Sequence, residues 1–328
     1  MRYHLLSRFI TIFFAILFLS ASYVEPSTAF TWGPYRGMTT QIDIKEQDIA
    51  DFAKLGGNLL RVGFTKQPLM KKEPPHEFDE ESFKKLDKII EWCAQYRVKI
   101  VIDPHTTPGT AQSTTISADD DIWKDPRYHD LLNSLWEKIA IRYHNHSNVV
   151  IGYDLLNEQA VKHLPFDAGT NDYNQLVKRL IKTIRKYDTN TPIIIEPPIG
   201  RSTFGKSVNR FEGLQYLDPP PDSKVVYSPH MYLPHAFTHQ GIQNRPEGIL
   251  YPGRIGVQFW DKEALRKTMM PALEWQRKYN VPIYIGEFSA ARGSGSNGNQ
   301  YLSDIIAIFE EHGWSWSYHA WREAAIWD

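Results

Sequence analysis

The chain of 328 residues has very little cysteine: Cys93 is the single one, so no intramolecular disulfide bond can form. Its place in an apolar helical pattern predicts a buried, inert thiol. An excess of charge is also missing, because 37 basic and 38 acidic side chains leave a formal charge of −1. Nucleic-acid-binding proteins normally carry a basic surplus, so no nucleic-acid partner is expected. Neither a linker nor an internal repeat divides the chain.

A short apolar run near the N terminus predicts a targeting signal. Residues 9–19 follow Arg2 and Arg8 and would span about 17 Å as a helix. The hydrocarbon core of a bilayer is about 30 Å thick, so no stable membrane anchor is expected. The small residues Ser27 and Ala29 suit a cleavage site. We predict that residues 1–29 are a cleaved secretory signal peptide and that 30–328 form one mature domain, which is secreted or periplasmic.

The rest of the chain alternates β-rich runs with amphipathic stretches. About 42% of the residues are apolar, which suffices for a large core. The runs are apolar throughout, as strands buried on both faces of a parallel sheet require. Together they predict a (β/α)8 TIM barrel, an α/β fold with a single domain, whose last helix is short or missing. The expected strands are 36–38, 58–64, 99–103, 149–156, 192–195, 224–227, 282–285 and 313–318.

Polar residues follow several of these strands directly. In a barrel the carboxyl ends of all strands meet at one face, so these side chains should converge there. Ionisable groups buried without partners are costly, and their convergence is better explained by a site than by isolated salt bridges. The residues are Arg61, His105, Asn157, Glu158, Glu196, His230, Tyr232, Glu287 and Trp321.

Three segments that contain these residues resemble glycoside hydrolase family five. That family comprises cellulase-like retaining β-glycosidases with glutamates on strands four and seven. The resemblance covers the chain from Trp32 to the end. Gln159 stands where the family usually has proline, which changes loop rigidity but no reacting group. The segments are Asn157-Glu158, Ile285-Gly286-Glu287-Phe288 and Pro229-His230-Met231-Tyr232.

The resemblance implies a double displacement on β-linked glycans, with Glu158 as acid/base and Glu287 as nucleophile. Cleavage needs one carboxyl group to protonate the leaving oxygen and a second, ionised one to attack the anomeric carbon. Retention requires the two to lie about 5–5.5 Å apart. Two further acidic residues are expected to have structural roles. Glu196 precedes two prolines, and Asp154 is expected to pair with Arg61.

The resemblance also implies the supporting roles. Arg61 and Tyr232 would contact Glu287, and His230 would support Glu158. Asn157 and His105 would bind the sugar, and Trp321 would form the indole platform beneath it.

The substrate class is expected to be a polysaccharide or oligosaccharide, and no cofactor or metal is expected. An endo-β-1,4-glucanase is the first choice, from family frequency alone. An exo-acting, mannan-specific or other β-glycan-specific glycosidase is the alternative. The long loops 106–126 and 233–259 could wall the cleft into a pocket, with the second contributing His235, Phe237, His239, Tyr251, Phe259 and Trp260.

The protein is expected to be a monomer. Two alternative functions of a different class stay open. A metal-dependent TIM-barrel hydrolase would need a His-x-His motif on the first strand, where residues 37–40 read Gly-Met-Thr-Thr. A non-catalytic sugar-binding barrel would not need the full acid, nucleophile, arginine and asparagine set. The glycine-rich segment Gly293–Gly298 matches a dinucleotide fingerprint but lacks its βαβ context, so a flexible loop is expected there.

Overall fold

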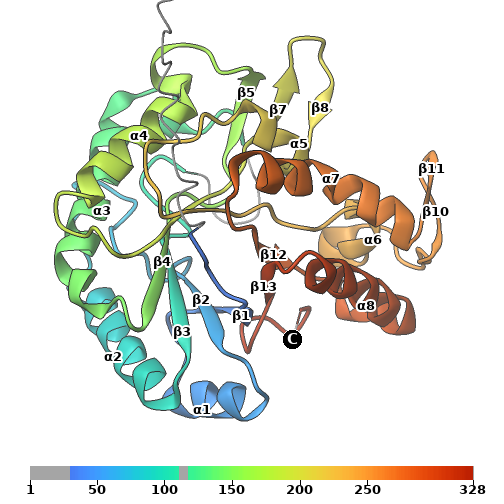
Figure 1. Ribbon diagram of the computed structural model, residues 1–328, viewed down its shortest axis with the longest axis horizontal. Helices are drawn as coiled ribbons and strands as arrows, with labels where there is room; N and C mark the ends of the chain where they lie inside the picture. Colours follow the sequence, from blue (N-terminus) through green and yellow to red (C-terminus); the bar gives the residue numbers. More distant parts are fainter. Residues whose placement is uncertain (1–29, 111–116, 328) are drawn as a thin grey trace, which may run out of the picture.

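The computed structural model describes residues 30–110 and 117–327 and forms a parallel β-barrel ringed by helices (Figure 1). The predicted signal peptide, 1–29, lies outside the described residues. The eight strands of the main sheet run in the order β12-β13-β1-β2-β3-β4-β6-β9. Parallel bridges from Tyr227 to Ile283 and from Met231 to Phe288 link the two edge strands and nearly close the sheet. The prediction of a single (β/α)8 barrel is confirmed.

The barrel strands coincide with the predicted ones to within a few residues. The longest extensions concern the first strand, which continues to Gln41, and the seventh, which continues through Glu287 to Phe288. The strands are β1 (Arg36–Gln41), β2 (Leu59–Gly63), β3 (Lys99–Asp103), β4 (Val150–Asp154), β6 (Ile193–Ile195), β9 (Val225–Tyr227), β12 (Tyr284–Phe288) and β13 (Ser315–Tyr318).

Helices cover the outside of the barrel with their apolar faces. Asp79, Asp125, Asp172 and Asp261 each cap a helix by accepting hydrogen bonds from backbone N–H groups of its first turn. Cys93 is fully buried in this layer, and burial raises the pKa of its thiol to about 12, which confirms the expected inert cysteine. The α-helices are α1 (Glu46–Lys54), α2 (Glu80–Tyr96), α3 (Pro126–Tyr143), α4 (Tyr173–Ile184), α5 (Arg210–Gly213), α6 (His235–Thr238), α7 (Lys262–Tyr279) and α8 (Gly295–Glu311).

The segment Gly293–Gly298 is helical, so the predicted flexible loop is wrong. Residues 292–294 make a 3-10 turn and α8 begins at Gly295. Gly298 is buried, and a Cβ there would lie 3.0 Å from the Cβ of Ser294. Gly298 therefore allows close packing in the first turn of α8, whereas a Cβ at Gly293 or Gly295 would meet no atom within 4 Å.

No helix follows β13 within the described residues 319–327, as the short or missing last helix predicted. The segment is instead tied to the barrel by hydrogen bonds. Arg292 N donates to Ile326 O at 2.9 Å, and Tyr318 Oη donates to Trp327 O at 2.8 Å. These bonds hold the final residues over the end of β13.

The barrel interior has an apolar floor with a polar layer directly above it. Trp32 plugs the floor and donates from Nε1 to Ile151 O at 2.8 Å. The floor side chains are Leu59, Val101, Ile194, Val226 and Tyr284. Because strand side chains alternate with a period of two, the residues two positions later face the same interior. They are Arg61, Asp103, Glu196, Ser228 and Gly286.

Two small sheets lie outside the eight-stranded sheet and were not predicted from the sequence (Figure 1). The first contains β5 (Ala160–Leu164), β7 (Ile199–Ser202) and β8 (Ser207–Val208), and the second is the hairpin β10 (Gly253–Ile255) with β11 (Gln258–Trp260). Short 3-10 helices occur at Asp121–Trp123, His144–His146, Gly169–Asn171, Leu214–Tyr216, Ile242–Asn244 and Arg292–Ser294.

The long loop 233–259 carries α6 and the β10–β11 hairpin, but part of its predicted wall is wrong. Phe237 and Tyr251 are buried and pack against Tyr301 of α8, with ring centroids 5.4 Å from it in both cases. Their apolar rings gain more from that core than from an open cleft. The loop 106–126 is described only in part, since 111–116 lie outside the described residues. Among the described helices, none has the length and apolar character needed to cross a bilayer.

Candidate active site

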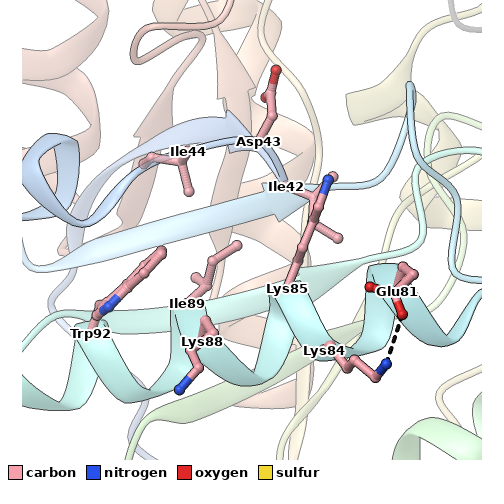
Figure 2. A pocket seen from close by; sticks show the side chains of 9 residues that line it. All are labelled: Ile42, Asp43, Ile44, Glu81, Lys84, Lys85, Lys88, Ile89 and Trp92. Atoms are coloured by element: carbon pink, nitrogen blue, oxygen red, sulfur yellow. Dashed lines mark hydrogen bonds and ion pairs between the residues drawn. The ribbon is translucent and has the colours of Figure 1, made fainter.

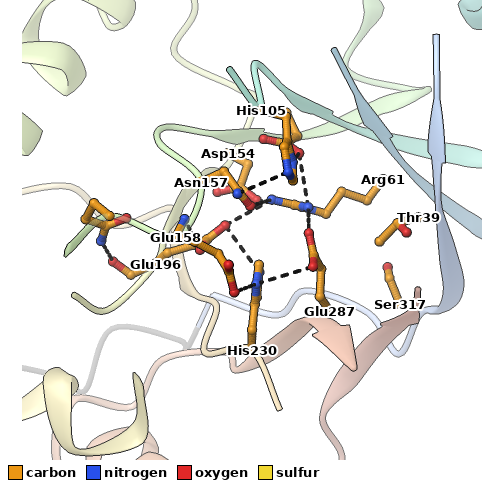
Figure 3. A network of polar contacts seen from close by, with 12 residues as sticks. Thr39, Arg61, His105, Asp154, Asn157, Glu158, Glu196, His230, Glu287 and Ser317 are labelled. Atoms are coloured by element: carbon orange, nitrogen blue, oxygen red, sulfur yellow. Dashed lines mark hydrogen bonds and ion pairs between the residues drawn. The ribbon is translucent and has the colours of Figure 1, made fainter. Parts of the chain in front are cut away.

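Glu158 and Glu287 meet at the carboxyl ends of the strands (Figure 3). Glu158 follows β4, and Glu287 lies within β12 where the pairing with β13 shifts register between Ile285 and Phe288. Such irregularities re-aim side chains, and here the carboxylate reaches the interior. One oxygen of each glutamate and a ring nitrogen of His230 all lie within 4.8 Å of one another.

Arg61 occupies the centre of the polar layer and is 1% exposed. Burial disfavours its charge, but the facing carboxylates outweigh this and raise the pKa of the guanidinium well above its ordinary value. The ion pair with Asp154 was predicted and is confirmed. The carboxylates are Asp103 at 3.0 Å, Asp154 at 2.9 Å, Glu196 at 3.0 Å and Glu287 at 2.7 Å.

Glu287 is buried, and both of its oxygens accept hydrogen bonds. Oε1 accepts from Arg61 Nη1 at 2.7 Å, and Oε2 accepts from the Tyr232 hydroxyl at 2.9 Å. Burial alone would raise the pKa of this carboxyl group. The positive charges of His230, His319 and Arg61 outweigh burial and hold the pKa of Glu287 well below its usual range. The group is therefore an anion at neutral pH, as a nucleophile must be.

Glu158 is more open and is paired with two cationic side chains. His230 Nδ1 lies 2.9 Å from Glu158 Oε1, and Arg210 Nε lies 3.4 Å from the same oxygen. Burial would raise the pKa of Glu158, but Arg210 and His230 lower it to about 2. These two cationic neighbours therefore favour the ionised form of Glu158, and His230 is the proton-carrying group in contact with it.

Asn157 and His105 line the same opening. The Oδ1 atom of Asn157 accepts from Arg61 Nη2 at 2.9 Å, and its Nδ2 lies 3.2 Å from His105 Nε2. The other nitrogen of His105, Nδ1, lies 2.8 Å from Asp103 Oδ2. These contacts fix both side chains before any ligand arrives. Their predicted sugar contacts stay predictions.

Trp321 is the one predicted site residue that the structure does not bring into this group. Its indole packs against Phe52 of α1, with ring centroids 6.0 Å apart, and donates from Nε1 to Asp48 O at 3.1 Å. Trp321 is half-buried in this position, and its predicted role as a sugar platform stays a prediction.

Trp327 lies near the site instead and was missed from the sequence. Its ring centroid is 6.2 Å from Tyr232, 5.2 Å from His239 and 5.7 Å from His319. Nothing in the pattern of the final segment distinguished it from Trp321. Asp103 and Arg210 were also missed. Asp103 was detectable, because it stands two residues after the inward-facing Val101.

A metal ion would find one set of ligands among the described residues, formed by Glu158, His230 and Glu287. The carboxylate oxygens of Glu287 already accept from Arg61 and Tyr232, so an ion would compete with both. A resident metal ion would have to break these hydrogen bonds, so the three residues are poorly suited to hold one.

A groove on the outside of the barrel, along α2 and the end of β1, offers no comparable chemistry (Figure 2). Lys84 and Lys88 of this groove pair with Glu81 and Glu91 at 2.7 Å, and Lys85 bonds to Gln67. Its other side chains are apolar or solvated, among them Ile42, Ile44, Ile89 and Trp92. The charges are therefore satisfied on the surface of α2.

Comparison with known proteins agrees with a glycosidase. Endoglucanase C of Acetivibrio thermocellus is 27% identical over 307 residues, covering 84% of each chain. Cellodextrinase A of Ruminococcus flavefaciens is 28% identical over 276 residues, covering 82% of this chain and 76% of that relative. The crystal structure of endoglucanase Cel5A from Thermotoga maritima superposes with a TM-score of 0.69 at 22% identity and covers 89% of this chain and 91% of that one. At this identity the superposition shows the shared fold.

Barrel and comparisons together define a glycoside hydrolase. The sequence pattern of the Cellulase family, glycosyl hydrolase family 5, matches residues 24–325. The chain belongs to that family, and the resemblance stated from its motifs is confirmed.

Proposed function

We propose that the protein cleaves β-linked glycans by double displacement with retention of configuration, with Glu287 as nucleophile and Glu158 as acid/base. The observation that carries this proposal is the pairing of the two carboxylates at the barrel mouth. Carboxylate oxygens within 4.8 Å of each other support the close approach of retaining enzymes, whose carboxyl groups lie about 5–5.5 Å apart.

The electrostatics support the division of roles. Glu287 is held as an anion by Arg61 and Tyr232, so it can attack the anomeric carbon. Glu158 touches a buried imidazole, so a proton is available to it for the leaving oxygen. After the glycosyl–enzyme forms, the same carboxylate can take a proton from the attacking water.

An endo-β-1,4-glucanase is the specific activity we propose. It is supported by the names of relatives such as endoglucanase C, at 27% identity over 84% of the chain. On a soluble cellulose derivative, viscosity should fall well before reducing ends accumulate. Reducing ends that rise in step with viscosity loss would favour an exo-acting enzyme with a walled pocket.

The test of the mechanism is a β-glycan panel with Glu158→Gln, Glu287→Gln and the unmodified protein. Glu274→Gln is the matched control, because Glu274 is exposed on α7. We expect either site variant to lose at least about 10³-fold in kcat/KM, the control to lose none, and the first product to keep the β configuration by NMR. Full activity of both site variants on every cleaved glycan would refute the assignment.

We also propose that the protein is exported as a monomer after removal of residues 1–29. The basic residues, apolar run and small residues of that segment support this. N-terminal sequencing of protein recovered outside the cytoplasm should begin near Phe30, and light scattering should give the mass of one chain. An intact Met1 on recovered protein would contradict cleavage.

A further inference from the structure

Glu196 is a buried carboxylate that contacts both the proposed acid and its imidazole partner (Figure 3). It follows β6 and is 0% exposed. Its Oε2 accepts from the backbone N–H of Glu158 at 2.8 Å. Its Oε1 lies 3.0 Å from Arg61 Nη2 and 3.2 Å from His230 Nε2. The carboxylate therefore touches the acid–base machinery at two separate atoms.

His230 bridges two carboxylates through its two ring nitrogens. Nδ1 lies 2.9 Å from Glu158 Oε1, and Nε2 lies 3.2 Å from Glu196 Oε1. A neutral imidazole has one N–H and one lone pair, so one of these carboxylates would face a lone pair. An imidazolium presents N–H groups to both. The ring is 3% exposed, so an imidazolium would offer an N–H group to each carboxylate, whereas a neutral ring would match both only if Glu158 carried the proton.

The surrounding charges agree with this geometry. Burial would lower the pKa of His230, but Glu196 and Glu287, together with the hydrogen bond to Glu158, raise it to about 10. The groups that face the ring are Glu158 after β4, Glu196 after β6, Glu287 on β12 at 3.8 Å, and Asp154 and Arg61 behind them. The net charge of the groups next to the imidazole ring is therefore negative.

The backbone of Glu158 is held in an uncommon conformation at the same place. Its φ is +46°, in the left-handed region that L-residues seldom occupy. The hydrogen bond from its N–H to Glu196 Oε2 stabilises this turn. Non-glycine residues persist there only where the surroundings fix them, and such strain is concentrated at functional sites. Glu196 thus sets where the acid carboxylate points.

We propose that Glu196 is a positioning residue for proton transfer: it fixes the main chain of Glu158 and keeps His230 as the imidazolium that stores the proton Glu158 delivers. The proposal rests on the proposed function of Glu158 and goes beyond it by naming the proton's source.

Protons are conserved over the two steps of the reaction, glycosylation and deglycosylation. In the first, the glycosidic C–O bond breaks, Glu287 bonds to the anomeric carbon, and Glu158 protonates the leaving oxygen. The proton comes from Nδ1 of His230, which becomes neutral. In the second, a water oxygen displaces Glu287, and Glu158 takes the water's proton and returns it to His230. One water is consumed for each bond cleaved.

The first test measures the imidazole itself by NMR of histidine-labelled protein. In the unmodified chain His230 should remain an imidazolium from pH 6 to 8. In Glu196→Gln, which removes the charge but keeps the shape, its titration should move down by about one unit or more. Tyr173→Phe is the matched control: the Tyr173 hydroxyl donates to Glu196 O at 3.1 Å, so its loss loosens residue 196 without changing charge. A neutral His230 at pH 7 in the unmodified protein, or equal titration in Glu196→Gln, would overturn the proposal.

The second test separates proton delivery from structural support. On an aryl β-glycoside with a poor leaving group, Glu196→Gln should lose about 10²-fold or more in kcat, with the basic limb of its pH profile moved to lower pH. On a dinitrophenyl glycoside, which needs no protonation, the loss in the glycosylation step should be under about fivefold. Glu196→Asp, which keeps the charge, should restore the basic limb. Equal losses on both substrates would mean that Glu196 is merely structural.

The two proposals fail differently. If the unmodified protein cleaves no β-glycoside, the proposed function fails, while the NMR titration still decides whether Glu196 controls His230.

Discussion

The ring of Trp327 lies with its centroid 6.2 Å from that of Tyr232, whose hydroxyl donates to Glu287 at 2.9 Å. This indole from the last described turn therefore stands one side chain away from the proposed nucleophile. His239 and His319 flank it, with centroids 5.2 Å and 5.7 Å away. An aromatic face in such a position suits the apolar face of a sugar ring.

Trp327→Ala should therefore impair catalysis more than folding. We expect kcat/KM on a cello-oligosaccharide to fall about 10- to 100-fold, because loss of a ring face removes roughly 1–3 kcal/mol of contact. Trp321→Ala is the comparison, since that indole packs on Phe52 of α1. It should lower the melting temperature and leave KM nearly unchanged. The opposite pattern would return the platform role to Trp321.

Gly286 leaves the space that the His230 ring fills. A Cβ at this position would lie 2.9 Å from His230 Nε2 and 2.5 Å from Ser228 Oγ. Gly286→Ala should displace the imidazole from Glu158 and reduce kcat by about 10²-fold or more. Gly152→Ala is the matched control, because its Cβ would meet only apolar atoms, such as Ile194 Cδ1 at 2.5 Å and Val101 Cγ2 at 3.1 Å.

Both glycine variants should lose about 1–3 kcal/mol of stability from overpacking, measured by urea unfolding. The pH profile should change only in Gly286→Ala. A changed profile in Gly152→Ala as well would show that any strain in the barrel disturbs proton transfer.

Asp188 makes the stability of the barrel depend on pH. Its carboxylate accepts from Thr191 N and Oγ1, Asn190 N and Tyr153 Oη, at 2.7–2.9 Å. Burial would raise its pKa, but the hydrogen bonds from Thr191, Asn190 and Tyr153 outweigh burial and lower it. A depressed folded pKa gives stability that is present above the unfolded value, about 3.9, and is lost as pH falls through the folded one.

Asp188→Asn should therefore cost about 1–3 kcal/mol at pH 7, because an amide N–H₂ would face donors. The difference from the unmodified protein should shrink in unfolding experiments below about pH 4. Asp218→Asn, on an exposed ion pair with Lys178, should change stability by under about 0.5 kcal/mol. A pH-independent effect of Asp188→Asn would contradict the linkage.

Removal of metal ions should leave activity unchanged. A resident metal on Glu158, His230 and Glu287 would displace Arg61 or Tyr232 from the proposed nucleophile, and those contacts are what keep it anionic. Dialysis against a chelator followed by assay on a β-glucan tests this. Activity lost on chelation and restored by one divalent cation would instead favour the metal-dependent hydrolase.

The barrel was predictable because its strands are apolar on both faces and end in polar residues. β3 is an example, since Lys99–Asp103 was recognised with its exact bounds. The short strands of the β10–β11 hairpin escaped notice because three residues of mixed polarity carry no periodic signal. The start of α8 was missed because its glycines disfavour a helix that tertiary packing nevertheless stabilises.

The site was predictable wherever a residue stands at a strand end. Arg61 and Glu287 were found this way, and so was the interior pairing of Asp154. Trp327 and Arg210 could not be found, because both lie outside the barrel strands, Trp327 after β13 and Arg210 at the start of the short helix α5, and no strand period relates such residues to the barrel axis. Trp321 stands three residues after β13, and its indole bonds to Asp48 O of α1, so its predicted platform role stays a prediction.

Arg61 touches four carboxylates, and one guanidinium cannot neutralise all of them. Asp154 illustrates the result: burial together with Glu196 and Asp103 outweighs Arg61 and raises its pKa well above the ordinary value. Protons added to this set distribute over several oxygens, so each inflection of a pH–rate curve is a macroscopic constant of the whole assembly. Substituting Asp154 should therefore shift the apparent constant of Glu287, and the acid limb of the enzyme is in this sense a collective property.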